Sequence, residues 1–213
     1  MVDEKGEFVE GKFLGYMLNA DRAGLQITVH AIGDEANSVL LNYLEELNKQ
    51  NGKRDRRFRL VHAQVLAPGD FKRLGELGVV AEVQPFHLSD DLRWMEERIG
   101  FERTKGAYAF KSIQASGAVL CFGTDWPGTS ASEYPINPML GLYAAVTRQT
   151  LTGEPAGGWF PNERISIEDS RPRGVVSEPF EDPAERNSKR ACLLDHWWKD
   201  GVSDARGRHV NQL

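Results

Sequence analysis

The chain has 213 residues, of which 40% are apolar and 27% are charged, which is enough to bury a core in one folded unit. Its 26 basic and 31 acidic residues are interspersed, and the net charge of -5 leaves no large basic surface for nucleic acid. No stretch reaches the apolar length of a membrane span, and the acidic, polar start is not typical of a targeting segment. Two cysteines are too few for a disulfide framework, so we expect a cytoplasmic protein.

Short runs of branched residues alternate with helical patterns from the beginning of the chain. Residues 24–30 (GLQITVH) predict a strand, and the apolar spacing over 36–47 predicts an amphipathic helix after it. Residues 58–62 (FRLVH) predict a second strand, and residues 68–78, from a proline to a glycine, predict a second helix.

The same order continues further along the chain. A third strand is predicted at 79–84, followed by a longer loop with PFHLSDDLRW and a helix at 107–117. A fourth strand at 118–123 and a helix at 137–148 follow. Because parallel neighbours need a crossover between them, this alternation predicts an α/β fold with a parallel sheet. From residue 171 onward the periodicity is lost, and no element is assigned there.

Three side chains that can bind metal occur at or just after the ends of predicted strands. His30 ends the first strand, His62 ends the second, and Asp125 lies two residues past the fourth. Because the carboxyl ends of parallel strands open onto one side, we expect these side chains to converge. Imidazole and carboxylate suit zinc, iron or manganese, and three protein ligands leave a position open for a water of lowered pKa.

Each of these residues also has a simpler interpretation. A single histidine at a strand end is more often a hydrogen-bonded core or loop residue than a ligand. An aspartate in a turn such as GTDWPG usually bonds its own backbone. The joint placement of all three at strand ends favours the metal site, because chance would scatter them among helices and loops.

Five ordered segments resemble the amidohydrolase superfamily, and within it the family 3 branch that includes N-substituted formamide deformylase-like proteins. They are ADRAGLQITVHAIGDEA (20–36), RFRLVHAQ (57–64), VVAEVQPFHLSDD (79–91), ERTKGAYAFKSI (102–113) and CFGTDWP (121–127). The resemblance implies a TIM-barrel-like (β/α)₈ fold of which only strands 5 to 8 and their helices are present. Residues 1–170 would form this partial amidohydrolase barrel, and residues 171–213 an unassigned tail.

The resemblance also implies roles for the three strand-end residues. His30 and His62 would be the metal ligands of strands 5 and 6. Asp125 would bind metal on strand 8 and would also be the catalytic group that takes the proton from the attacking water. The expected cofactor is a divalent metal, zinc in the first place, with one or two ions in complete members of the family.

The same resemblance places His87, Asp90 and Trp126 in the pocket for a small-molecule substrate, with a solvated loop or a packed aromatic ring as the alternative for each. The implied reaction is the hydrolysis of a carbon–nitrogen bond other than a peptide bond, of amide or formamide type, through a metal-activated water.

The sequence departs from the family pattern in its first half. The His-x-His pair of the first barrel strand and the bridging lysine or acidic residue of the fourth are missing, so the metal site is incomplete. The favoured explanation is a fragment of a longer enzyme with a missing N-terminal half. A homo-oligomer or a second chain that supplies the other strands, and an inactive remnant, remain open. The alternative function is a catalytically incomplete half-barrel that serves as an assembly or interaction module through its open sheet edges.

Overall fold

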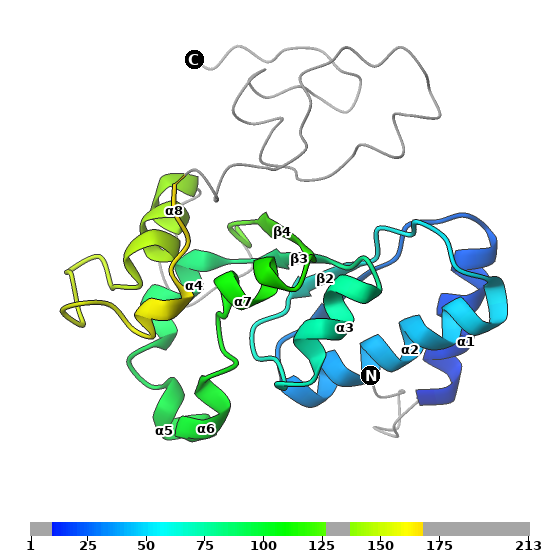
Figure 1. Cartoon of the computed structure of the whole chain (residues 1–213), viewed down its shortest axis with the longest axis horizontal. Coiled ribbons are helices and arrows are strands. Elements are labelled where there is room, and N and C mark those ends of the chain that lie inside the picture. Colours follow the sequence, from blue (N-terminus) through cyan, green and yellow to red (C-terminus); the bar gives the residue numbers. More distant parts are fainter. Residues whose placement is uncertain (1–9, 127–136, 168–213) are drawn as a thin grey trace, which may run out of the picture. The chain divides into compact units, whose positions relative to one another are not determined.

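The computed structural model describes residues 10–126 and 137–167 (Figure 1). The tail at 171–213 therefore lies outside the described residues. The chain divides into two compact units. The first comprises Met1–Val83 and Asp91–Leu120, and the second comprises Gln84–Asp90 and Cys121–Leu213.

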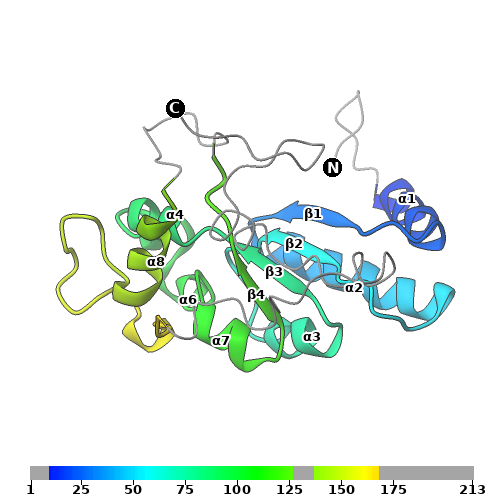
Figure 2. The same cartoon turned by 90° about the horizontal axis from the view of Figure 1, so that it is seen from above.

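Four strands form one sheet in the order in which they occur in the chain (Figure 2). They are β1 (Thr28–Ala31), β2 (Arg59–His62), β3 (Val80–Val83) and β4 (Val119–Phe122). Strand β2 pairs in parallel with both β1 and β3, and the amide of Val119 at the start of β4 donates to the carbonyl of Val79 over 3.1 Å. The predicted α/β class with a parallel sheet is confirmed.

Helices follow the strands as the alternation predicted. Those of the first unit are α1 (Glu10–Arg22), α2 (Asp34–Asn51), α3 (Asp70–Glu76), α5 (Met95–Ile99), α6 (Phe101–Thr104) and α7 (Phe110–Ala115). Helix α4 (Pro85–Asp91) follows β3, and the second unit also holds α8 (Pro138–Thr147) and the 3₁₀ turn η1 (Pro161–Glu163). None of the described helices combines the length and the apolar character that a membrane crossing requires.

The core of the first unit lies between the sheet and the helices α2, α3 and α7, which share one face of it (Figures 1 and 2). Four leucines of α2 at helical spacing are buried, as an amphipathic helix requires. They are Leu40, Leu41, Leu44 and Leu47. Leu60 of β2 and Ala81 of β3 are register partners and are fully buried, which identifies the face that the helices cover.

The opposite face of the sheet is more polar. His30, Val61 and Glu82 are partners across β1, β2 and β3, and each is exposed or half-buried. Arg59 also projects to this face, where its guanidinium forms an ion pair with Glu82. The strands therefore separate an apolar side from a side that carries imidazole and charge.

Four helices were not predicted, namely α1, α4, α5 and α6. Helix α1 occupies a segment whose glycines, Gly11 and Gly15, weaken the helical pattern. The prediction of a loop over residues 85–94 is wrong for the first part of this segment, because Pro85 begins α4. Proline suits the first position of a helix, where the missing amide has no partner to lose. His87 and Asp90 therefore lie on a helix rather than in a loop.

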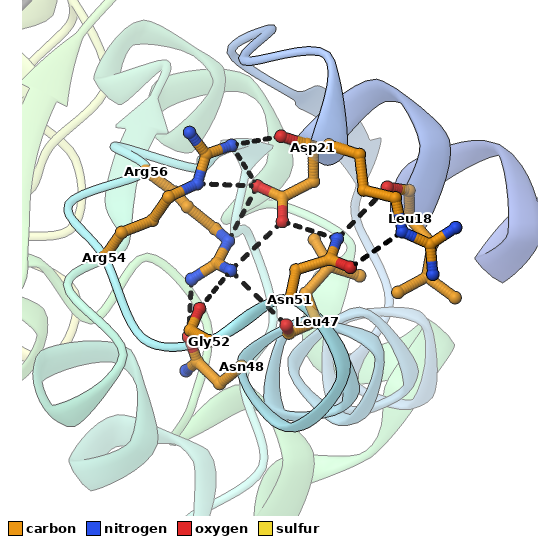
Figure 3. A network of polar contacts seen from close by, with 9 residues as sticks. Leu18, Asp21, Leu47, Asn48, Asn51, Gly52, Arg54 and Arg56 are labelled. Carbon is orange, nitrogen blue, oxygen red and sulfur yellow. Dashed lines mark hydrogen bonds and ion pairs between the residues drawn. The ribbon is translucent and has the colours of Figure 1, made fainter.

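Helix α1 is joined to the α2–β2 connection through a buried carboxylate, Asp21 (Figure 3). Only 2% of Asp21 is exposed, and it accepts from the guanidinium groups of Arg54 and Arg56 and from the amide of Asn51. Burial alone would raise the pKa of Asp21, but these donors outweigh it and lower the pKa to about 2. Arg56 also donates to the carbonyl of Gly52 at the end of α2.

Candidate metal centre

Two of the sequence-predicted ligands, His30 and His62, lie together in the first unit. Their ring centroids are 4.4 Å apart and the rings meet edge to face. His30 is exposed, whereas His62 is 6% exposed. The strand register pairs His30 with Val61, so regular alternation would put His62 on the opposite face.

The backbone of His62 explains why the rings meet. Its φ is 75°, whereas a residue in a parallel strand has a φ of about −120°. This difference turns Cβ by roughly half a circle about the N–Cα bond, which directs the imidazole to the face of His30. Ala63 follows with a φ of 44°, so two successive non-glycine residues are left-handed.

The loops that follow β1 and β2 are tied together by Asn37, a fully buried residue of α2. Its Nδ2 donates to the carbonyl oxygens of Gly33 and Val65, both at 2.9 Å. The amide of Val65 in turn donates to the carbonyl of Ile32 over 2.9 Å. Because these bonds link the segments just beyond His30 and His62, they fix the two strand ends relative to each other.

A second polar cluster, which the sequence did not predict, adjoins the segment after His62. Asp91 Oδ2 accepts from Gln64 Nε2 at 2.7 Å and from Tyr108 Oη at 2.5 Å. Burial raises the pKa of Asp91, and the two hydrogen bonds oppose the rise. The three residues are 17 and 27 positions apart along the chain, so no local pattern indicates the cluster.

In the second unit, His87 faces Asp125. Nε2 of His87 lies 3.8 Å from Oδ2 of Asp125, and His87 is 8% exposed. Burial lowers the pKa of His87, and the nearby carboxylate of Asp125 opposes this. The imidazole is therefore neutral near pH 7, which is the form that binds metal.

The separation of His87 and Asp125 fits a shared metal better than a direct hydrogen bond. At 3.8 Å the two atoms are too far apart for a hydrogen bond. Two ligands that each lie about 2.1 Å from one tetrahedral zinc are about 3.4 Å from each other. The pair therefore offers one nitrogen and one oxygen donor at close to the spacing that a single ion needs.

The structure also describes the other two residues predicted to bind substrate. Asp90 is half-buried in the last turn of α4, and 55% of Trp126 is exposed beside Asp125. The amide of Trp126 donates to Oγ1 of Thr124 over 3.3 Å, which shapes the turn after β4. Their role in substrate binding stays a prediction.

Several of the residues described above have a left-handed backbone. Among the described non-glycine residues with positive φ are His62, Ala63, Tyr108 and Asp125. Such conformations cost about 1–3 kcal/mol each and persist only where the surrounding structure enforces them. The surrounding structure therefore enforces the backbone conformation at these positions.

A model of the amidohydrolase family matches residues 3–171 of the chain. The Arabidopsis thaliana protein LONG AFTER FAR-RED 3 is 40% identical over 186 residues, which cover 87% of this chain and 29% of that protein. The N-substituted formamide deformylase of Arthrobacter pascens is 22% identical over 187 residues, which cover 83% of this chain and 32% of that enzyme.

A solved structure is similar as well. The crystal structure of an uncharacterized metal-dependent hydrolase from Pyrococcus furiosus has a TM-score of 0.62 and 31% sequence identity. The match covers 78% of this chain and 31% of that one. The chain thus spans about a third of the length of the proteins that it matches.

Proposed function

The chain belongs to the amidohydrolase family, and from this premise we propose that it supplies half of the active site of a metal-dependent hydrolase. The bond cleaved would be a carbon–nitrogen bond other than a peptide bond, of amide or formamide type. The name of the Arthrobacter pascens relative supports the formamide class, and the Pyrococcus furiosus hydrolase supports the need for a metal.

The proposed ligands are His30, His62 and Asp125, with His87 as a further donor beside Asp125. The order of the strands supports this set, because His30 and His62 end β1 and β2, while His87 and Asp125 follow β3 and β4. Within the second unit, His87 and Asp125 offer one imidazole and one carboxylate at a spacing that suits a divalent ion. Zinc is the proposed metal.

A bound divalent metal would lower the pKa of a water molecule and polarise the carbonyl group of the substrate. The carboxylate of Asp125 would accept the proton from the attacking water and return it to the leaving nitrogen. His87 would stay neutral and keep its lone pair available, because burial lowers its pKa. Trp126 and Asp90 would contact the substrate.

We propose further that β1–β4 are strands 5 to 8 of a (β/α)₈ barrel. Helices on one face and polar residues on the other suit the outside and the inside of a barrel. His30 and the Arg59–Glu82 ion pair would then face the interior.

A second candidate function is an assembly module. Strand β1 favours it, because this strand has one neighbour in the described sheet and could pair with a further strand.

The experiment measures metal content and hydrolysis together. The full chain, loaded with zinc and dialysed, should retain zinc in proportion to protein, and both His62→Ala and Asp125→Asn should lose it. His196→Ala is the matched control. Because His196 lies outside the five segments that resemble the family, this variant should keep its zinc. Simple N-alkyl formamides and amides then test the reaction. Zinc retention that is the same in all four proteins would overturn the proposal, and a chain that forms a defined oligomer without metal would favour the assembly module.

A further inference from the structure

The turn after β2 is strained at the residue that the proposed function uses as a ligand. His62 and Ala63 are left-handed in succession, with φ of 75° and 44°. An isolated chain would relax such a turn, because β-carbons crowd the backbone in this region. Contacts from elsewhere in the fold must therefore hold it.

Those contacts form a closed ring of three residues. The carbonyl of Gln64 accepts from the amide of Tyr108 at 2.8 Å. The side chains of Gln64 and Tyr108 both donate to Oδ2 of Asp91, at 2.7 and 2.5 Å. Gln64 is 8% exposed and Tyr108 is 3% exposed, so water does not compete freely for these bonds.

Neighbouring backbone contacts make the ring rigid. Val65 forms an antiparallel bridge with Ala107, and the amide of Leu66 donates to the carbonyl of Gly106 at 3.0 Å. Tyr108 is itself left-handed, with a φ of 49°. The two segments, 64–66 and 106–108, are thus joined along their backbones, and Asp91 closes the arrangement through side chains.

We infer that Asp91 is a positioning residue for His62, because its carboxylate holds Gln64 and Tyr108 and so maintains the turn that directs the imidazole toward His30. Asp91 acts through Gln64, two residues beyond His62, and not as a ligand. The inference rests on the proposed function in one respect only, namely that His62 binds the metal.

An asparagine at this position distinguishes hydrogen bonding from charge. The side-chain oxygen of Asn can accept from both Gln64 and Tyr108, whereas alanine removes both bonds. Asp91→Asn should therefore retain the position of His62, and Asp91→Ala should not. Tyr108→Phe keeps the aromatic side chain and removes one of the two hydrogen bonds to Asp91, so its effect should lie between those of Asp91→Asn and Asp91→Ala.

The test titrates Co²⁺ into the metal-free full chain and follows its visible absorption. Asp91→Ala should weaken Co²⁺ binding about 10- to 100-fold, as removal of a residue that orients a ligand does, and Asp91→Asn should restore most of the affinity. The carboxylate of Asp55 is exposed, so the control Asp55→Ala should bind as the unmodified chain does. In a His62→Ala background, Asp91→Ala should have no further effect.

A second measurement needs no metal. The imidazole NMR signals of His62 in the metal-free protein should shift in Asp91→Ala and return toward their original positions in Asp91→Asn. If Asp91→Ala does not fold, Tyr108→Phe takes its place in both measurements. Unchanged affinity and unchanged His62 signals in a folded variant overturn the inference and leave the proposed function standing. A shift of the His62 signals in a chain that binds no Co²⁺ supports the positioning role and overturns the proposed function.

Discussion

The imidazole rings of His30 and His62 lie 4.4 Å apart, edge to face, although the parallel register pairs His30 with Val61. The left-handed φ of His62 brings them together. Two histidines that alternation would separate thus reach the same face of the sheet through the conformation of one residue.

The close approach of Gly106 to the segment after His62 makes a direct prediction. A Cβ at Gly106 would lie 2.0 Å from the carbonyl oxygen of Leu66. Gly106→Ala should therefore force the two backbones apart and destabilise the protein by more than about 2 kcal/mol, measured by urea unfolding. Gly69→Ala is the control, because a Cβ there meets nothing within 4 Å. Equal stability of the two variants would contradict the packing described here.

The buried carboxylate of Asp21 gives a second prediction. Asp21→Asn leaves the guanidinium of Arg56, whose side chain is 6% exposed, without its counter-charge. Breaking a buried pair in this way should lower the free energy of unfolding by about 3 kcal/mol. Asp55→Asn removes a pair with Arg57 in which the aspartate side chain is 68% exposed, so its effect should be under about 1 kcal/mol.

Acid should weaken the protein through the same residue. The pKa of Asp21 is about 2 in the folded state and 3.8 otherwise, so the folded state favours the charged form. This stabilises the fold by about 2 kcal/mol above pH 4, and the contribution disappears as the pH falls from about 4 to about 2. Unfolding curves over this range should show the loss in the unmodified chain and a smaller loss in Asp21→Asn. Parallel curves for both proteins would be inconsistent with the assigned pKa.

The strands were predictable from sequence because their branched residues are local signals. Strand β2 begins at Arg59, one residue after its expected start. Strand β1 begins later than expected, at Thr28. The placement of His30 and His62 at strand ends followed from the same signals. Helix α4 was missed because it has only seven residues and starts with a proline.

The finer features of the site depend on contacts between distant segments. The φ of His62 is maintained by residues that lie far away in the chain, so regular alternation alone gives the wrong face for its ring. The contact of His87 with Asp125 joins positions that sequence reasoning assigned to different roles. Such relationships arise from tertiary packing and have no local pattern.

The most direct test of the central claim, that this chain carries metal ligands, is thermal and urea unfolding of the metal-free full chain with and without zinc. Zinc at about 100 times its dissociation constant should raise the free energy of unfolding by about 2.7 kcal/mol, because it binds the folded state. His62→Ala and Asp125→Asn should lose most of this increase. Identical unfolding curves with and without zinc would contradict the account.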